Sequence, residues 1–449
     1  MPDTQCKGKV GVISLGCPKN LVDTEKMLGR FIESGYQLTP NPGEADLLVV
    51  NTCGFKADAE AESREAILEM AEFKSLNPKV RLVVTGCLSQ RYGDQLQREI
   101  PAIDVLAGAT EYEKLIPTLE SNAPPPPISA PNPGTGEEAP RVLTTSPHTA
   151  YVKIAEGCNN PCAFCIIPKL RGPFVSREPE DIDEEVASLV AQGVKEINLI
   201  SQDTTLYGRD LDRRLSLADL LQGLKSVEGL GWIRLLYLYP TLVTDQLLEL
   251  MAEENAILPY FDVPLQHSHS AVLKRMKRAE RGPDVENLIT RIRRYMPKAT
   301  IRTTFIVGFP GETDEEFLHL FNFVKTARFD HVGVFTYSDE IGTTAYDLPD
   351  KIPASVAQER RDRLMALQQT ISQEKLSALV GQKIKVLVDG ISEENEWLME
   401  GRTAAQAPDV DGVVYINDGS PQPGTLVEVE ITEAHEYDLV GHVVGRGSP

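Results

Sequence analysis

Short apolar runs alternate with amphipathic segments along the first 120 residues. The runs at 10–15, 47–50 and 82–85 are almost continuously apolar, as expected for strands that are covered on both faces. Apolar residues recur at helical spacing in the segments 21–34 and 57–72, which lie between these runs. This alternation predicts an α/β domain with a parallel sheet over residues 1–120.

Residues 121–145 interrupt the alternation. Proline fills positions 124–127, and proline and glycine recur as far as Pro140. This composition is typical of an extended linker, and we predict one between two domains.

Strands and helices resume near residue 146 and continue to 379. Six apolar runs centre near residues 152, 197, 233, 260, 301 and 332. Helical patterns follow at 184–192, 245–252, 286–295 and 314–326, and a long one at 354–380 closes the unit. Repeated βα units of this number predict an open or closed TIM-like barrel, (βα)6, with its chemistry at the C-terminal ends of the strands.

Residues 380–449 have a different pattern. Short alternating strands are expected at 383–388, 413–416, 426–431 and 439–443, separated by Gly, Asp and Pro. About five such strands form a small antiparallel barrel of the OB-like kind. The chain is thus predicted to be an α/β protein of three domains, in line with its 449 residues.

Composition restricts where the protein works and what it binds. No apolar run approaches the roughly 20 residues of a membrane helix, and the N-terminus lacks the pattern of a signal peptide. We therefore expect a cytoplasmic protein without a membrane partner. The net charge of −21 disfavours a phosphate backbone as partner and favours a basic protein.

Three of the seven cysteines are close together in the sequence. Cys158, Cys162 and Cys165 form C-x3-C-x2-C directly after the first strand of the predicted barrel. Three thiolates cannot complete a four-cysteine site. They can hold a [4Fe–4S] cluster with one open iron, or a zinc ion with a distant fourth ligand, for which His148 is the nearest upstream histidine.

Three other cysteines are dispersed but share a context. Cys17, Cys53 and Cys87 each follow an apolar strand, so a parallel sheet would bring them to one rim. A second three-thiolate cluster is the favoured interpretation, and three buried structural thiols are the alternative. Cys6 stands outside any strand and is left unassigned.

The compact cysteine motif resembles that of the radical-SAM superfamily, with Phe164 at the aromatic position before the last cysteine. The resemblance implies that S-adenosylmethionine binds the open iron and is cleaved to a 5′-deoxyadenosyl radical. The whole chain resembles the methylthiotransferase family, whose N-terminal domain holds an auxiliary cluster and whose C-terminal barrel is a TRAM domain. It implies two [4Fe–4S] clusters, an electron donor of the flavodoxin or ferredoxin type, and insertion of a methylthio group at an unactivated C–H bond.

Two local sequences distinguish the branches of this family. Residues 14–25 read SLGCPKNLVDTE and resemble the branch that modifies an aspartate of ribosomal protein uS12, whereas the transfer-RNA branch usually has Gln-Met-Asn after that cysteine. Residues 261–270 read FDVPLQHSHS, with Asp262 and Gln266-His267 where the other branch typically has His and Gln-Ser. The resemblance therefore implies β-methylthiolation of aspartate in uS12. The alternatives are methylthiolation of adenosine in transfer RNA and a non-catalytic, zinc-stabilised scaffold that binds the ribosome.

Charge in two regions bears on this choice. Residues 380–449 contain four basic and thirteen acidic residues, which suits a lysine-rich ribosomal protein better than RNA. A basic run opposes it: Lys274, Arg275, Lys277, Arg278, Arg281, Arg291, Arg293, Arg294 and Lys298. We interpret most of these as solvated helix faces, which leaves room for an RNA contact.

Polar residues after other strands complete the predicted site. Gln202 follows the second barrel strand, and Gly308 and Glu312 lie in the GFPGET run after the fifth. Together with Phe164, they are predicted to contact the cofactor, while Cys17, Cys53, Cys87, Cys158, Cys162 and Cys165 are predicted to bind metal. Loop capping, including an N-cap at Thr313, explains the same polar residues equally well. His267 and His269 are either site residues or solvated.

Overall fold

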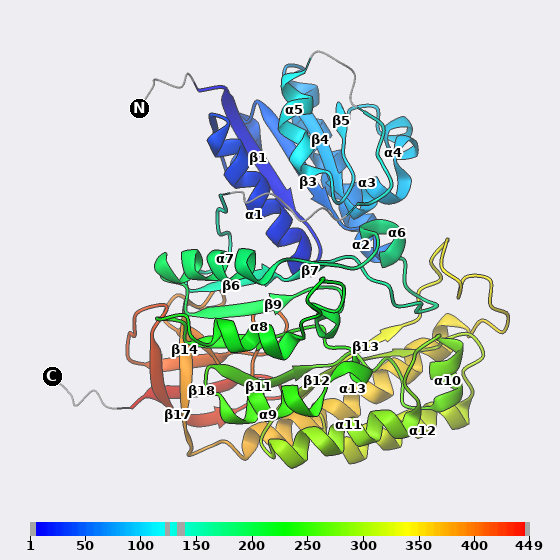
Figure 1. The fold of residues 1–449 in the computed structure, drawn as a ribbon, viewed down its shortest axis with the longest axis vertical. Helices are drawn as coiled ribbons and strands as arrows, with labels where there is room; N and C mark the ends of the chain where they lie inside the picture. The colour runs from blue at the N-terminus through cyan, green and yellow to red at the C-terminus, as the bar shows by residue number, and fades with distance from the viewer. Residues whose placement is uncertain (1–5, 122–125, 133–139, 445–449) are drawn as a thin grey trace.

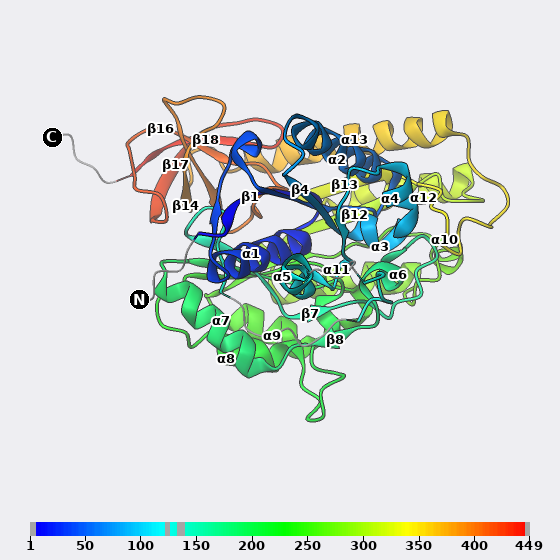
Figure 2. The same cartoon turned by 90° about the horizontal axis from the view of Figure 1, so that it is seen from above.

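The computed structural model describes residues 6–121, 126–132 and 140–444 (Figure 1). A parallel-sheet domain stands on the rim of a larger βα sheet, and a small β-barrel packs beside that sheet (Figures 1 and 2). The predicted fold class, α/β with these three parts, is confirmed.

The N-terminal sheet is parallel throughout, in the order β2-β1-β3-β4-β5. Its strands are β1 (Gly8–Ser14), β2 (Tyr36–Leu38), β3 (Leu47–Thr52), β4 (Arg81–Gly86) and β5 (Val105–Leu106). Helices α1 (Pro18–Glu33), α2 (Ala57–Leu76), α3 (Cys87–Tyr92), α4 (Asp94–Glu99) and α5 (Leu115–Glu120) cover it. Alternate residues of β3 enter two separate apolar cores, Val50 on one face and Val49 on the other. Burial on both faces explains why these strands read as continuous apolar runs.

The predicted linker lies partly outside the described residues, which omit 122–125 and 133–139. Its described parts carry no helix or strand, and both are anchored. Ser129 donates from its hydroxyl to Glu111 at 2.7 Å, and Ile128 packs on the N-terminal core. Arg141 bonds Glu25 of α1 at 2.8 Å through Nε and Glu185 at 2.8 Å through Nη1.

The central sheet has the six predicted strands, all parallel, in the order β13-β12-β11-β10-β9-β6. They are β6 (Thr149–Lys153), β9 (Glu196–Ile200), β10 (Trp232–Leu235), β11 (Ile257–Asp262), β12 (Thr300–Val307) and β13 (His331–Thr336). Strands β6 and β13 are its two edges, so it is an open, partial barrel. The helices are α7 (Pro179–Ala191), α8 (Leu217–Leu224), α9 (Asp245–Glu253), α10 (Ser270–Arg275), α11 (Gly282–Tyr295), α12 (Asp314–Ala327) and α13 (Ala354–Ser377).

Between β6 and α7 lie the short strands β7 (Ala155–Glu156) and β8 (Val175–Ser176), which pair with each other, and helix α6 (Ile167–Arg171). These elements carry the compact cysteine loop at the C-terminal rim of the sheet, directly below the N-terminal domain (Figure 1).

The C-terminal domain is a closed barrel with the strand order β14-β15-β16-β18-β17. Its strands are β14 (Lys383–Ile391), β15 (Met399–Thr403), β16 (Val414–Asp418), β17 (Leu426–Ala434) and β18 (Leu439–Val443). One pair, β16 with β18, runs parallel, whereas we expected antiparallel pairing throughout. Hairpin signals in a sequence report neighbouring strands only. They do not reveal which strand closes the barrel.

This barrel docks against the inner face of the central sheet. Arg402 of β15 pairs with Glu196 of β9 at 2.6 Å, and the Tyr260 hydroxyl of β11 donates to Asp411 at 2.5 Å. Asp389 contacts Arg402 and His148. Part of the acidic charge that we assigned to partner binding is therefore used within the molecule, although most acidic residues of the domain remain outside these contacts.

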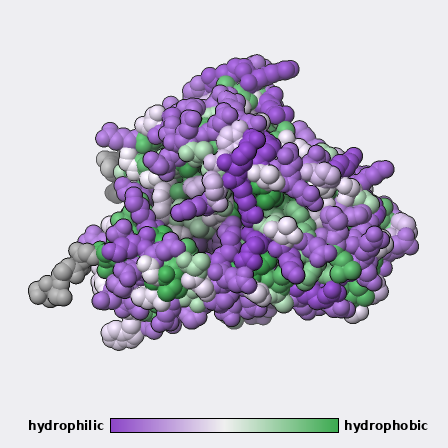
Figure 3. Space-filling model, turned by 90° about the horizontal axis from the view of Figure 1, so that it is seen from below, coloured by the Kyte–Doolittle hydropathy of each residue, from purple (hydrophilic) through white to green (hydrophobic). Residues whose placement is uncertain are grey.

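The described residues contain no helix that is long and apolar enough to cross a membrane. Hydrophilic residues dominate the face seen in Figure 3, and apolar ones form small separate groups there.

Candidate active site

The compact cysteine loop runs from β7 to α6 and is held by backbone hydrogen bonds. The Cys158 amide donates to the Gly172 carbonyl at 3.1 Å, which ties the start of the loop to its end. Two amides point at sulfur: Asn160 N lies 3.4 Å from Cys158 Sγ, and Ile167 N lies 3.4 Å from Cys165 Sγ. Amide donors aimed at sulfur stabilise thiolates, as a metal cluster requires.

Arg278 brings a positive charge to this loop. Its Nη1 lies 3.6 Å from Cys162 Sγ, its Nε pairs with Glu280 at 2.5 Å, and its guanidinium lies 4.0 Å from the Tyr239 ring centroid. The side chain is buried. The interpretation of the basic run as solvated helix faces is therefore wrong for Arg278, because the loop after α10 turns it inward.

Burial controls the acidity of these thiols. It raises the pKa of Cys158 to about 11 and that of Cys165 to about 12, and the neighbouring thiols act in the same direction. The Arg278 charge opposes the shift at Cys165. The thiols of this loop therefore lie close enough together to affect one another's charge.

The dispersed cysteines meet at the C-terminal rim of the N-terminal sheet. Cys17 is the N-cap of α1, Cys53 follows β3, and Cys87 begins α3 directly after β4. Strands β1, β3 and β4 are adjacent and parallel, so their ends converge. Gly16 has φ +93°, and a Cβ there would lie 2.8 Å from the Cβ of Cys53. Only glycine permits this approach of the first two cysteine loops.

Electrostatic effects connect the three dispersed thiols. Burial raises the pKa of Cys87 to about 11. The charge of Arg171 lowers it, and Cys17 and Cys53 both raise it. Cys6 precedes β1 at its opposite end and is exposed, with its Sγ 3.7 Å from the Gly8 carbonyl. The donor set at the rim therefore fits a second three-thiolate cluster, with Cys6 excluded from it.

Helix α6 joins the two cysteine sites. It begins two residues after Cys165 and ends at Arg171, while Ile166 and Leu170 pack on Cys87. Arg171 pairs with Asp23 of α1 at 2.7 Å and also donates to Asn20. The compact and dispersed triads therefore lie on either side of one short helix.

A buried polar network surrounds Arg171. Lys153 at the end of β6 pairs with Glu156 at 2.7 Å and with Asp23, and Arg171 lies 3.3 Å from Glu156. These opposite charges compensate one another, and Lys153 and Arg171 hold the pKa of Glu156 at about 2 against its burial. The network fixes α1 of the N-terminal domain to the rim of the central sheet.

A second contact fixes the other side of the N-terminal domain. Glu340, in the loop after β13, pairs with Arg91 of α3 at 2.8 Å and accepts from the Ala57 amide of α2 at 2.9 Å. Arg91 also donates to the Gly54 carbonyl, next to Cys53. Two separated attachments hold the domain more firmly than one.

The predicted cofactor residues lie in different surroundings. Gln202 donates to Glu156 at 2.5 Å and so joins the Arg171 network. Phe164 packs beside Phe309, within the GFPGET run. Asp203, the residue after Gln202, accepts from Asn160 of the cysteine loop at 2.7 Å. The loop after the first strand thus contacts the loops after the second and the fifth strand, as a shared cofactor site needs, while the individual cofactor contacts stay predictions.

The carboxylate of Glu312 binds other residues of the protein. Its carboxylate accepts from the Gly308 amide and lies 3.0 Å from Arg360 and 3.2 Å from His267 Nε2. Both Glu312 and His267 are buried, and burial lowers the pKa of His267. His267 is therefore not a solvated loop histidine. His269 is half-buried and lies 3.5 Å from Glu316.

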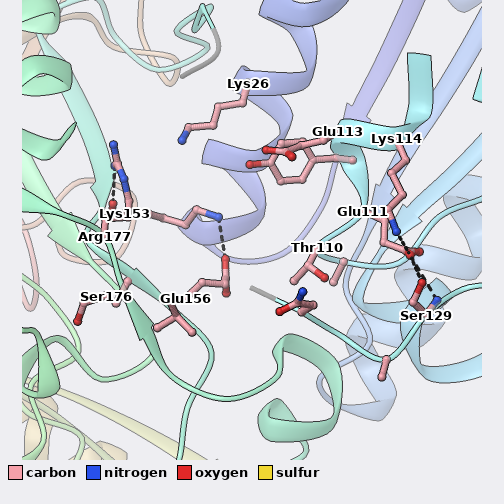
Figure 4. Close-up of a pocket in the computed structure, with 16 residues that line it drawn as sticks. Lys26, Thr110, Glu111, Glu113, Lys114, Ser129, Lys153, Glu156, Ser176 and Arg177 are labelled. Atoms are coloured by element: carbon pink, nitrogen blue, oxygen red, sulfur yellow. Dashed lines mark hydrogen bonds and ion pairs between the residues drawn. The ribbon is translucent and has the colours of Figure 1, made fainter. Parts of the chain in front are cut away.

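A cavity of about 330 Å³ lies beside the network, between the N-terminal domain and the central sheet (Figure 4). Lys26 enters it from α1 and Lys153 from β6, while Glu111, Lys114 and Ser129 form the far wall. Its described lining contains no cysteine, so it is separate from the cysteine sites.

Among the described residues, no three of His, Cys, Asp and Glu lie close enough together to bind a single metal ion. A zinc ion binds each sulfur at about 2.3 Å. Each thiolate of a [4Fe–4S] cluster instead binds a different iron. The two kinds of centre therefore require different spacings of the sulfur atoms.

Comparison with protein families divides the chain as the fold does. Residues 9–108 match the Uncharacterized protein family UPF0004, 152–324 the Radical SAM superfamily and 380–444 the TRAM domain. Among solved structures, the radical S-adenosylmethionine methyltransferase TsrM from Kitasatospora setae has a TM-score of 0.55 at 15% identity and covers 73% of this chain and 74% of its own. The cobalamin-dependent radical enzyme OxsB has a TM-score of 0.51 at 13% identity, covering 83% and 56%. These two show the fold alone.

Curated relatives match nearly the whole chain. Proteins named ribosomal protein uS12 methylthiotransferase RimO are 48% identical in Anaeromyxobacter sp. (strain K), over 98% of this chain and 94% of the relative, and 44% identical in Geobacter sulfurreducens, over 98% and 100%.

The open (βα)6 sheet with its cysteine loop at the C-terminal rim defines a radical-SAM enzyme that carries an additional cysteine domain and a TRAM domain. Its near full-length similarity identifies the branch: the chain belongs to the family of uS12 methylthiotransferases, RimO.

Proposed function

We propose that this chain inserts a methylthio group at the β-carbon of an aspartate side chain of ribosomal protein uS12. The name of its 48%-identical relatives supports the substrate. The observation that carries the proposal is the position of Arg171. It ends the helix that follows the compact triad and pairs with Asp23 of the helix that begins at the dispersed triad. An open metal site at each of two adjoining sheet rims would suit a reaction that needs both a radical and a sulfur donor.

Cys158, Cys162 and Cys165 would hold one [4Fe–4S] cluster, and Cys17, Cys53 and Cys87 a second. When bound, the first supplies an open iron and an electron for cleavage of S-adenosylmethionine, and the second an open iron for the sulfur that is transferred. Phe164, Gln202, Gly308 and Glu312 are proposed for the cofactor site. Arg278 and the amides of Asn160 and Ile167 stabilise the thiolate charge of the first triad.

The chain's own residues position the two sites and exclude water. Lys153, Arg171, Asp23 and Glu156 are buried between the domains and have compensating charges, so they fix α1 on the barrel rim without an uncompensated charge. A reactive radical requires such a rigid and shielded setting, because mobile water permits side reactions.

Boundaries and partners follow the same proposal. We assign 1–120 to the cluster-bearing N-terminal domain, 121–145 to the linker, 146–379 to the radical-SAM domain and 380–449 to the TRAM domain. An electron donor of the flavodoxin or ferredoxin type and a cytoplasmic location suit a ribosomal substrate.

Mass spectrometry of the products tests the substrate. Anaerobically reconstituted enzyme is incubated with S-adenosylmethionine, a reductant and either uS12 or transfer RNA. We expect the mass of one methylthio group in place of hydrogen on uS12 only, located on an aspartate. The same gain on RNA alone would overturn the proposal.

A triple cysteine variant tests the second cluster. Replacing Cys17, Cys53 and Cys87 by alanine should remove about half of the bound iron and leave cleavage of S-adenosylmethionine intact, because the other triad keeps its ligands. Cys6→Ala is the matched control and should keep all the iron. Loss of cleavage in the folded triple variant, or unchanged iron, would contradict separate roles for the triads.

A further inference from the structure

Lys19 is a buried cation at the boundary between the dispersed triad and the barrel rim. It is the second residue after Cys17, in the first turn of α1, and it is 6% exposed. Its Nζ lies 2.9 Å from the ring centroid of Tyr237, which follows β10 at the C-terminal rim of the central sheet. The side chain thus crosses from the N-terminal domain to the mouth of the barrel.

The ammonium of Lys19 has no carboxylate partner. Nothing in the described parts of the chain forms a hydrogen bond or ion pair with it, and its contact is the face of an aromatic ring. Three other buried cations near the cysteine sites, Lys153, Arg171 and Arg278, pair with carboxylates. A buried, unpaired charge is costly, so an anion that reaches Lys19 would be bound strongly.

The ring beneath Lys19 is held in an unusual conformation. Tyr237 has φ +61°, a left-handed value that a non-glycine residue adopts only when its surroundings enforce it. Asp262 enforces it by accepting from the Tyr237 amide at 2.9 Å through Oδ2, while its Oδ1 pairs with Arg302 at 2.9 Å. Both oxygens of Asp262 are thereby occupied by other donors, so it supports the ring and acts on Lys19 only through its charge, without a direct ion pair.

Lys19 and Asp262 lie 243 positions apart in the sequence and in different domains, yet both contact Tyr237. Lys19 lies over the ring, and Asp262 accepts from the backbone amide. An adenine base carries no negative charge, whereas an aspartate side chain carries one directly beside the carbon to be modified.

We infer that Lys19 binds the carboxylate of the target aspartate, with the Tyr237 ring as the floor of the site. The inference rests on the proposed function and names the residue that selects its substrate. The carboxylate completes the missing ion pair. It thereby places the adjacent β-carbon between the sulfur site at Cys17 and the cofactor site in the barrel.

The test combines two enzymes with two substrates. Binding of uS12, and of uS12 with its modified aspartate replaced by asparagine, is measured anaerobically on reconstituted wild-type and Lys19→Met enzyme. A charge-assisted pair should make the wild type bind the aspartate form about 10- to 100-fold more tightly. In Lys19→Met this ratio should fall close to one, with binding of the asparagine form unchanged. Lys19→Arg keeps the charge and should keep most of the ratio.

Lys225→Met is the matched control, because Lys225 pairs with Glu254 at 2.6 Å outside the site. It should preserve the wild-type ratio. Iron content and cleavage of S-adenosylmethionine without uS12 report whether each variant is intact.

The outcomes separate the two claims. If the wild type modifies uS12 but Lys19→Met keeps the wild-type ratio, or weakens both substrate forms equally, the role of Lys19 is overturned and the proposed function stands. If the wild type discriminates between the two forms but never modifies uS12, the proposed function fails instead. If Lys19→Met does not fold, loss of the ratio in a folded Lys19→Arg enzyme would overturn the inference.

Discussion

Arg171 Nη1 lies 2.7 Å from Asp23 Oδ2, and this ion pair connects the two cysteine sites. Arg171 ends the helix that follows Cys165, and Asp23 lies on the helix that begins at Cys17. The pair is buried, so it depends on complete compensation of charge. Its rigidity determines how the two cysteine sites face each other.

Replacing Arg171 by Gln should therefore damage both sites. It leaves Asp23 and Glu156 with one cation, Lys153, and removes the bond to Asn20. Breaking a buried pair costs about 3–5 kcal/mol. We expect a lower unfolding temperature and less iron per chain after reconstitution, measured by thermal denaturation and iron analysis under anaerobic conditions.

Arg213→Gln is the control for this prediction, because Arg213 pairs with Glu180 at 2.6 Å on the exposed surface. Such pairs contribute about 0–1 kcal/mol. Equal stability and equal iron content in the two variants would show that the buried network does not hold the domains together.

The second prediction concerns Arg278 and the compact triad. Its guanidinium donates to Cys162 Sγ at 3.6 Å, and donors to cluster sulfur raise the reduction potential. Arg278→Met should make the potential more negative and lower the fraction of the cluster that a given donor reduces, while Arg278→Lys, which keeps the charge, should change both less. A redox titration followed by electron paramagnetic resonance measures the potential.

Arg275→Met provides the comparison. Arg275 belongs to the same basic run but pairs with Glu316 at 2.6 Å. Its replacement should therefore leave the reduction potential of the cluster unchanged. A wild-type potential in the Arg278 variant would exclude a direct effect on the cluster.

Local patterns predicted the parts of this protein that depend on neighbouring residues. The apolar runs were enough to predict the six strands of the central sheet, because a strand buried on both faces is continuously apolar. The strand-end positions of Cys17, Cys53 and Cys87 were enough to predict their convergence, since parallel strands end at one rim.

Contacts between distant residues could not be predicted in the same way. Arg278 read as part of a charged helix face, and only the turn after α10 directs it to Cys162. Arg171 and Asp23 are separated by 148 positions, and Lys19 and Tyr237 belong to different domains. No periodicity reports such pairs. Asp262 stood out through the family resemblance, whereas Lys19 did not, and no pattern revealed that the two meet at Tyr237.

The third prediction separates packing from cofactor binding at Gly308. This residue has φ +73°, and a Cβ on it would lie 2.4 Å from the Cβ of Ala357 in α13. Gly308→Ala should therefore cost about 2–4 kcal/mol of stability, from backbone strain and overlap together. Ala357→Gly in the same chain removes the overlap but not the strain, so the double variant should recover part of the loss.

Binding of S-adenosylmethionine is measured on the same variants. Recovery of stability without recovery of binding would indicate a cofactor contact at Gly308. Recovery of both would assign the whole effect to the packing of α13.

The fourth prediction concerns the pH dependence of stability through Lys26. Burial lowers the pKa of Lys26 to about 8 from its ordinary 10.5. Glu185 opposes the shift, while Arg177, Lys153 and Arg141 add to it. The folded state thus binds fewer protons than the unfolded state between about pH 8 and 10.5. The free energy of unfolding should rise with pH in this window, and below it the buried charge is fully destabilising.

Lys26→Met removes the free-energy cost of burying this charge. At pH 7 we expect the variant to be more stable than the wild type by roughly 1–3 kcal/mol, with the difference shrinking as the pH rises from 8 towards 10. Thermal unfolding of the holoenzyme across this pH range measures the difference in stability.

Lys114→Met is the control, because Lys114 lines the same cavity but is exposed and pairs with Glu111 at 2.9 Å. Its stability should follow the wild-type curve. A Lys26 variant that is less stable than the wild type at pH 7 would mean that the ammonium is stabilised in the cavity, which would contradict a dominant cost of burial.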